Sequence, residues 1–141
     1  AGRPFFSFGA YATARGWARF GMLLRDDGRF LGREILPPGL LHRCFEPSPA
    51  MPAYGLGLWR NAPASNPLWL PPVLHDRFAK KGPILSAEGP ADLYAAVGYD
   101  DNRLYVIPSR HLVIVRLGAG AGSFTDRDLV NRILALGTSP H

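Results

Sequence analysis

The sequence predicts a globular domain of the α+β class, with an antiparallel sheet followed by a C-terminal helix. In the last third of the chain, three short apolar runs alternate with turn residues, which is typical of antiparallel strands. A capped amphipathic run follows them and indicates a helix. The chain has 141 residues and is 47% hydrophobic, so it can bury a core. Its 16 glycines and 14 prolines follow no period, so we expect many turns.

The N-terminal part predicts two helices. Residues 14–25 carry apolar side chains at helical spacing, and Thr13 is a suitable N-cap in front of them. Two aspartates and a glycine then predict a turn that opens a short connection over residues 26–36. A second short helix fits residues 38–45, because Pro38 lies in the first turn, where a missing N–H costs nothing.

The middle of the chain predicts one strand and one long excursion. Tyrosine, leucine and tryptophan alternate with glycine over residues 54–59, which indicates a strand with a close neighbour over its glycines. Residues 61–90 contain six prolines and little periodicity, so we expect a long connection with a short helix near residues 74–80. Connections of that length tend to be functional.

The C-terminal part predicts three strands and a helix. A tight turn at residues 108–110 makes the last two strands an antiparallel hairpin. The helix begins after Thr125, where acidic residues resemble a capping box, and it closes at Gly137. The helix covers one face of the sheet. The expected strands are residues 93–98, 103–107 and 112–117.

Patterns for several kinds of chemistry are absent from the sequence. No serine is followed three residues later by lysine, and there is no GxSxG motif. The four histidines are scattered and Cys44 is the single cysteine, so we expect neither a metal site nor a disulfide. The glycines of residues 118–122 do not have the spacing of a dinucleotide-binding loop, and we interpret them as a flexible connection. No cofactor is expected.

The charge pattern also excludes some partners. The formal net charge is +5, but lysines and arginines are spread singly along the chain, often close to an acid. Phosphate recognition needs a clustered basic stripe, so we expect no nucleic-acid partner. No apolar run approaches the roughly 20 residues that a membrane-spanning helix needs. The sequence leaves the cellular compartment open.

Four segments resemble, in the same order, motifs of β-lactamase-related serine hydrolases, a group that includes esterases and 6-aminohexanoate-dimer hydrolases. YATARGWARFG resembles the family's YxTARDxARFG helix start, and DDGRFLGREILPPG resembles xGxWxGxxILPEG. YGLGLW is similar to the strand motif YGxGWW, and GYDDNRLYVIPSRHLVIVRLG resembles GxxxQxxYVxPxxDLVVVxxG. Together they cover nearly the whole chain: residues 11–21, 26–39, 54–59 and 98–118.

The resemblance implies a partial β-lactamase/transpeptidase-like fold. Residues 1–50 would end its helical region, and residues 51–141 would form the C-terminal part of its α/β sheet domain. The nucleophile motif SxxK and the tyrosine motif would then lie before Ala1. This chain would act only with that N-terminal half, as part of a serine hydrolase, and alone it would bind the missing half or self-associate.

The resemblance also assigns candidate site residues. The strand that bears the Lys-Thr-Gly motif in β-lactamases corresponds to residues 93–99, so the backbone N–H of Tyr99 would complete the oxyanion hole. Gly98 would let substrate approach the backbone, and Asp100 and Asn102, in the following turn, are candidate substrate contacts. Trp59 is a candidate wall of the substrate cleft, although packing in the core is the commoner role of such a tryptophan.

Departures from the family pattern narrow the expected substrate. Ala96 and Val97 replace the lysine and hydroxyl residue that recognise the carboxylate of a β-lactam, so an uncharged ester or amide is expected instead. Gly16 replaces an aspartate that would have supported the Thr13 cap. Two alternatives stay open: a non-catalytic penicillin-recognition-like binding module and, on the charge alone, a nucleic-acid-binding domain.

Overall fold

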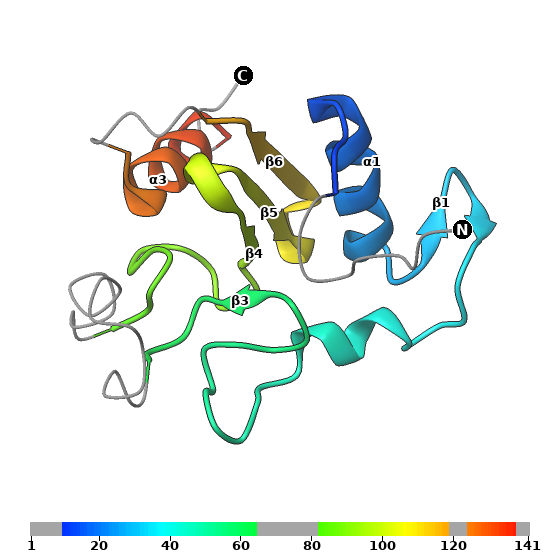
Figure 1. Ribbon diagram of the computed structural model, residues 1–141, viewed down its shortest axis with the longest axis horizontal. Helices are drawn as coiled ribbons and strands as arrows, with labels where there is room; N and C mark the ends of the chain where they lie inside the picture. The colour runs from blue at the N-terminus through cyan, green and yellow to red at the C-terminus, as the bar shows by residue number, and fades with distance from the viewer. Residues whose placement is uncertain (1–9, 65–81, 119–123, 138–141) are drawn as a thin grey trace.

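The computed structural model describes residues 10–64, 82–118 and 124–137 (Figure 1). It confirms the α+β class, because an antiparallel sheet with the strand order β3-β4-β5-β6 is accompanied by helices and by a second, two-stranded antiparallel sheet. The predicted helix near residues 74–80 lies outside the described residues. The main elements are α1 (Ala14–Arg25), β3 (Trp59–Arg60), β4 (Tyr94–Val97), β5 (Arg103–Ile107), β6 (Leu112–Arg116) and α3 (Asp126–Leu136).

Both predicted helix starts are confirmed at their caps. Thr13 has extended backbone angles, and its side chain accepts a hydrogen bond from the N–H of Gly16 over 3.1 Å. Thr125 caps α3 in the same way, accepting from the N–H of Asp128 over 3.1 Å. A threonine oxygen thus satisfies one of the free N–H groups at each helix start.

The segment after α1 contains more structure than the sequence predicts. Residues 26–36 form a turn and then the two-stranded sheet of β1 (Arg29–Phe30) and β2 (Arg33–Glu34). Leu31 and Gly32, between the two strands, both have positive φ, as the two-residue turns of β-hairpins require. Leucine is unusual at a position with positive φ. Residues 31–32 therefore lack the usual sequence signal of a two-residue hairpin turn, and the hairpin was not predicted.

The second predicted helix is shorter and tighter than expected. A 3₁₀ helix, η1 (Leu41–Phe45), replaces the helix predicted over residues 38–45. Gly39 has a φ of 79°, outside the right-handed helical region, and its N–H donates to Asp27 Oδ2 over 2.6 Å. The preceding residues therefore belong to a turn tied to the end of α1.

The strand predicted over residues 54–59 is wrong, because this segment folds back on itself. The N–H of Gly55 donates to the carbonyl of Leu58 over 2.8 Å, and Tyr54 forms an isolated bridge with Trp59. Gly57 takes a φ of 82° at the reversal, so only its end joins β3. The expected close neighbour exists, since a Cβ at Gly55 would collide with the carbonyl oxygen of Cys44.

The three C-terminal strands are confirmed. β4, β5 and β6 pair antiparallel, with Tyr105 opposite both Ala95 and Ile114. The predicted turn between the last two strands is a 3₁₀ turn, η4 (Pro108–Arg110), closed by His111 at a φ of 48°. Every residue of β5 is buried, as expected of a strand with a neighbour on each edge and a helix on each face.

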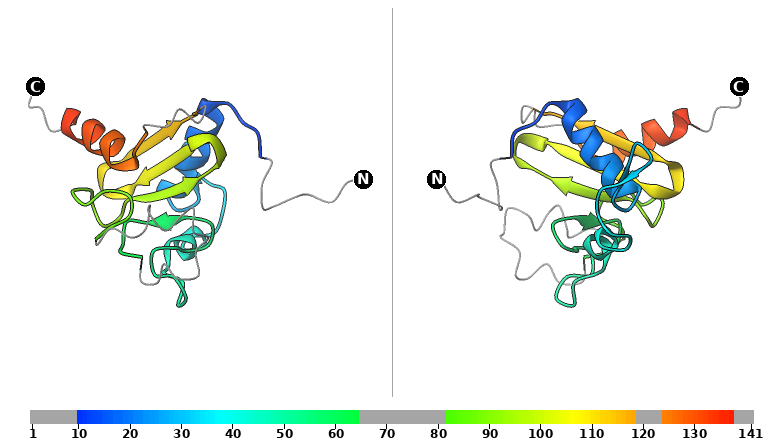
Figure 2. Two further views of the ribbon diagram at one scale, coloured as in Figure 1. Left: turned by 60° about the vertical axis from the view of Figure 1, so that its left-hand side comes forward. Right: turned by 90° about the vertical axis from the view of Figure 1, so that its right-hand side faces the viewer.

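Helices α1 and α3 lie on opposite faces of the sheet (Figures 1 and 2). Leu104 and Val106 of β5 pack with Leu24 of α1, whereas their neighbours Tyr105 and Ile107 pack in a separate cluster with Val130 of α3. This alternation follows from the pleat, which points successive side chains of a strand to opposite faces. The prediction that the terminal helix covers one sheet face is therefore confirmed.

The division into residues 1–50 and 51–141 stays a prediction. Within residues 10–64, 82–118 and 124–137, no helix is long and apolar enough to cross a membrane.

Candidate functional site

Four of the predicted site residues line one groove of about 690 Å³ at the end of β4. Tyr11 and Trp17, from the start of the described chain and from α1, line it too, as do residues 115–117 at the end of β6. Most of the lining is apolar or aromatic, with few polar groups, as is common in small-molecule sites. The predicted residues in the groove are Gly98, Tyr99, Asp100 and Asn102.

The predicted site residues belong to the connection between β4 and β5, which we call the 98–102 loop. Its centre is the 3₁₀ turn η3 (Tyr99–Asp101), and both Asp100 and Asp101 have positive φ, 54° and 59°. Left-handed backbone costs a residue with a side chain roughly 1–2 kcal/mol, although aspartate tolerates it better than most. Contacts with the rest of the molecule must therefore hold the loop in this shape.

Asn102 closes the loop from within. Its N–H and its side-chain amide both donate to the carbonyl of Tyr99, over 3.1 and 2.8 Å, and its own carbonyl accepts from the N–H of Gly98 over 2.9 Å. Its side-chain oxygen accepts from the N–H of Gly118 over 3.0 Å. The predicted role as a substrate contact is thus joined by a structural role, because this side chain already has partners at both its nitrogen and its oxygen.

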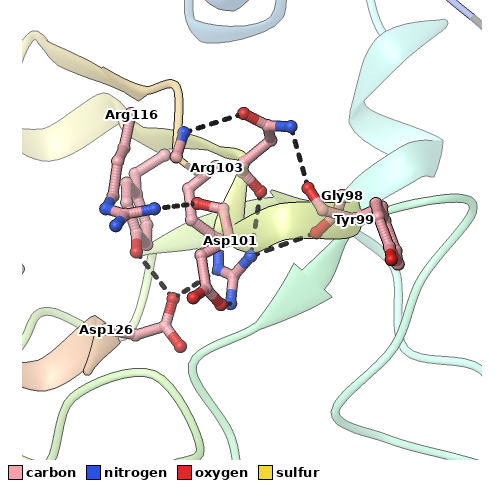
Figure 3. A network of polar contacts seen from close by, with 9 residues as sticks. Gly98, Tyr99, Asp101, Arg103, Arg116 and Asp126 are labelled. Carbon is pink, nitrogen blue, oxygen red and sulfur yellow. Dashed lines mark hydrogen bonds and ion pairs between the residues drawn. The ribbon is translucent and has the colours of Figure 1, made fainter. Parts of the chain in front are cut away.

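Tyr99 is the most exposed residue of the loop. The residue is 88% exposed, and Figure 3 shows its side chain pointing away from the buried side of the loop. Its carbonyl is engaged by Asn102, whereas no described residue accepts a hydrogen bond from its N–H. A backbone donor at the wall of a groove can bind an oxygen that carries developing negative charge.

Neither of the two glycines that border this site has a left-handed backbone, and of the two only Gly118 has no room for a Cβ. Gly98 is extended, with φ −105° and ψ 172°, and a Cβ there would lie 3.3 Å from the Cβ of Asn102. At Gly118, a Cβ would collide with the side chain of Arg116 and with the carbonyl oxygen of Asp100. The interpretation of residues 118–122 as a flexible connection stays a prediction; residues 119–123 lie outside the described part.

Arg103, which the sequence analysis did not single out, anchors the buried side of the loop (Figure 3). Its guanidinium group donates to the carbonyls of Gly98 and Asn102 over 3.3 and 2.9 Å. It also donates to carboxylate oxygens of Asp101 and Asp126, over 3.2 and 2.8 Å. The side chain is only 1% exposed, so these acceptors take the place of water around a buried charge.

Asp126 connects this network to α3. It lies in the first turn of the helix, and the oxygen that accepts from Arg103 also accepts from the hydroxyl of Tyr105 over 2.6 Å. Burial raises the pKa of Tyr105, and the nearby Asp126 carboxylate raises it further. Tyr105 is therefore protonated at neutral pH and donates a hydrogen bond to Asp126.

Arg116 contacts the loop from the end of β6. It donates to the carbonyl of Asp101 over 2.6 Å, and its guanidinium carbon lies 4.0 Å from the centre of the Phe124 ring. Arg116 and Arg103 both line the groove, but the contacts above engage both guanidinium groups. A ring under a guanidinium group stabilises its charge by a cation–π contact.

Trp59 lies apart from the other predicted site residues. It is half-buried in β3, its ring contacts Tyr54 at 4.7 Å between centroids, and it packs beside two core clusters. It does not line the groove at the 98–102 loop. Its position agrees with the commoner role of such a tryptophan, which is packing.

The described residues provide no obvious metal site, since no three His, Cys, Asp or Glu side chains among them are grouped to hold an ion. Comparison of the sequence with protein-family models and with curated proteins finds no match.

Proposed function

We propose that this chain is the C-terminal portion of a β-lactamase-related serine hydrolase, and that it supplies the Tyr99 N–H as one oxyanion-hole donor. The observation that carries the proposal is the position of this donor: it lies two residues after the end of β4, at a groove, and has no acceptor among the described residues. The ordered resemblance of four segments to motifs of that family supports the same assignment.

The chemistry expected of such a donor is specific. A serine from the N-terminal half would attack the carbonyl carbon of an ester or amide, and the carbonyl oxygen would become an oxyanion. An N–H placed about 3 Å from that oxygen stabilises the charge more in the transition state than in the substrate. The leaving alcohol or amine departs as the acyl-enzyme forms, and water then releases the acid.

The charges around the groove favour an uncharged substrate. Ala96 and Val97 line the groove where the family has a lysine and a hydroxyl residue. The two arginines that also line it already have partners, since Arg103 pairs with two carboxylates and Arg116 stacks on a ring. A free cation for a substrate carboxylate is missing from the described lining, which agrees with a neutral ester or amide.

The surface of the sheet supports the proposed N-terminal partner. Among the described residues, β6 pairs with β5 on one edge and with no strand on the other. An open edge can accept a further antiparallel strand. Several large apolar side chains near α1 and the β1-β2 sheet are also exposed, as expected of a surface that another part of the protein covers: Phe20, Leu31 and Ile35.

Serine labelling of a longer gene product tests the proposal. The reading frame would be extended upstream of Ala1, and the purified protein treated with a fluorophosphonate probe. We expect one serine, within an SxxK motif, to be labelled and a p-nitrophenyl ester to be cleaved, and the chain of residues 1–141 to do neither. An extended protein that is folded yet takes no label and cleaves no ester would support the binding-module alternative and overturn the hydrolase.

A further inference from the structure

We propose that Arg103 is the positioning residue of the 98–102 loop, and that α3 controls this loop through the contact between Asp126 and Arg103. The catalytic meaning of this inference rests on the proposed function, since it concerns the orientation of the Tyr99 N–H. The structural coupling itself can be measured on the chain described above.

Arg103 contacts the loop at three places. It binds the carbonyls of Gly98 and Asn102, at the two ends of the loop, and the carboxylate of Asp101 near its centre. One of these acceptors precedes Tyr99 in the sequence and the other two follow it. A single rigid, planar guanidinium group thus fixes the loop around the residue whose N–H would bind the oxyanion.

The backbone of the loop needs contacts of this kind to keep its shape. Asp100 and Asp101 both take left-handed backbone angles, which an unconstrained chain would seldom adopt. Asp100 is exposed, so burial of its side chain does not hold this conformation. The contacts of the loop with Arg103, Arg116 and Gly118 are the described interactions that tie it to the sheet.

Asp126 orients the guanidinium group of Arg103. The Nε atom of Arg103 donates to Asp126 over 2.8 Å, which leaves the two terminal nitrogens facing the loop. Asp126 belongs to α3, whose Val130 is fully buried against the sheet. Docking of α3 therefore places the carboxylate, the carboxylate orients the guanidinium group, and the guanidinium group holds the loop (Figure 3).

Amide hydrogen exchange, followed by NMR, tests the coupling in the whole chain. The reporters are the N–H groups of Gly98, Asn102 and Gly118, each of which donates a hydrogen bond within or onto the loop. In Asp126→Asn, we expect these three amides to exchange at least tenfold faster than in the unaltered protein. The amide of Val106, in the same strand as Arg103, should change much less.

Asp128→Asn is the matched control. It removes the same charge from the same helical turn, but Asp128 is exposed and its side chain lies outside the network. We expect its exchange rates to match those of the unaltered protein, so that loss of a helix-terminal charge is separated from loss of the Arg103 contact. Unchanged loop amides in a folded Asp126→Asn variant would overturn the coupling.

Steady-state kinetics of the longer, serine-containing protein, without the label, test the catalytic meaning. Arg103→Lys keeps the charge but not the planar fork, so we expect kcat to fall at least tenfold with little change in KM, because the oxyanion exists only after attack. Asp126→Glu should recover part of the kcat that Asp126→Asn loses. Equal kcat in all of these variants would refute the positioning role even if the labelling experiment succeeds.

The two proposals can fail separately. If the extended protein takes no serine label while Asp126→Asn accelerates exchange at the loop, the hydrolase assignment is wrong and the structural coupling stands. If the label forms but the loop amides and kcat do not respond to Asp126→Asn, the hydrolase stands and the coupling is wrong.

Discussion

The side chain of Asn61 and the backbone of Ser86 bind each other in both directions. Asn61 Nδ2 donates to the carbonyl of Ser86 over 2.8 Å, and the N–H of Ser86 donates to Asn61 Oδ1 over 2.9 Å. The same Nδ2 also lies 3.3 and 3.2 Å from the carbonyls of Gly89 and Pro90. One buried amide thus fastens the end of β3 to the segment that leads into β4.

Substitution of Asn61 should destabilise the fold strongly. Asn61→Ala leaves the Ser86 N–H and carbonyl buried without their partner, so we expect the free energy of unfolding to fall by about 2–4 kcal/mol. Urea unfolding followed by tryptophan fluorescence measures it. Ser86→Ala is the control: it keeps both contacts with Asn61, removes the hydroxyl that donates to Asn131, and should cost about 1 kcal/mol. Equal losses in the two variants would contradict this account.

Two glycines of α1 should respond oppositely to alanine. At Gly21, a Cβ would lie 2.5 Å from Val113 Cγ1 and 2.8 Å from Leu104 Cδ1, so Gly21→Ala must displace these side chains or α1 and should cost about 1–3 kcal/mol. At Gly16, the nearest neighbour of a Cβ is the Ala12 side chain at 3.3 Å, and Gly16→Ala should stabilise by about 0.5–1 kcal/mol. Thermal unfolding compares them; a stabilising Gly21→Ala would show that this packing is loose.

The ion pair of Arg25 and Asp26, at the end of α1, should add a small contribution to the free energy of unfolding that is lost at low pH. Two hydrogen bonds of 2.7 Å from Arg25 lower the pKa of Asp26, against the opposing effect of burial. A lowered folded-state pKa stabilises the protein above the ordinary aspartate value of about 4 and loses that effect as pH falls further. Asp26→Asn should therefore cost at most about 1 kcal/mol at pH 7, because solvent screens the partly exposed pair, and less near pH 2. Urea unfolding at both pH values tests this; a pH-independent difference would contradict it.

Tyr105 should make the fold sensitive to alkali. Burial, and then the Asp126 carboxylate, raise the pKa of Tyr105 above its ordinary value of about 10. The stabilisation is complete below that value and is lost as pH rises past it, because the unfolded chain then ionises first. Between pH 10 and 11.5, the free energy of unfolding should fall more steeply than in Tyr105→Phe. Parallel losses in the two proteins would show that other groups cause the alkaline sensitivity.

Two variants of Tyr99 should distinguish the role of its backbone N–H from the role of its side chain. In the longer, serine-containing protein, Tyr99→Pro deletes the donor, and Gly98, at φ −105° and ψ 172°, already has the extended backbone that a following proline requires. We expect kcat to fall about 100- to 1,000-fold. Tyr99→Ala keeps the N–H and should retain a kcat within a few-fold of the unaltered protein. Similar kcat values for the two variants would remove Tyr99 from the proposed oxyanion hole.

Elements whose signals are local could be predicted from the sequence. The caps at Thr13 and Thr125 hydrogen-bond within three residues, and β5 and β6 are apolar runs separated by a short turn. Residues 54–59 show the limit of such patterns, because alternation with glycine fits both a strand and a tight reversal. In the folded protein, the carbonyl of Cys44, a residue distant in sequence, leaves no room for a side chain at position 55. A local pattern contains no information about this contact.

The candidate site was predictable in part. The resemblance placed Gly98, Tyr99, Asp100 and Asn102 together, and all four line the groove. The contact of Arg103 with Asp126 joins positions 23 residues apart, and no local pattern links an arginine at the start of a strand to an acid in a helical first turn. A charged residue at the start of an otherwise apolar strand was the one available signal.

The left-handed backbone of Asp100 and Asp101 limits which sequences this loop can accept. Glycine, asparagine and aspartate tolerate such angles, whereas β-branched residues do not. In a library randomised at both positions and selected for folding, these three residues should dominate, and valine, isoleucine and threonine should be depleted. The shape of the loop would then be recorded in the variants that survive, independently of any reaction that the protein catalyses.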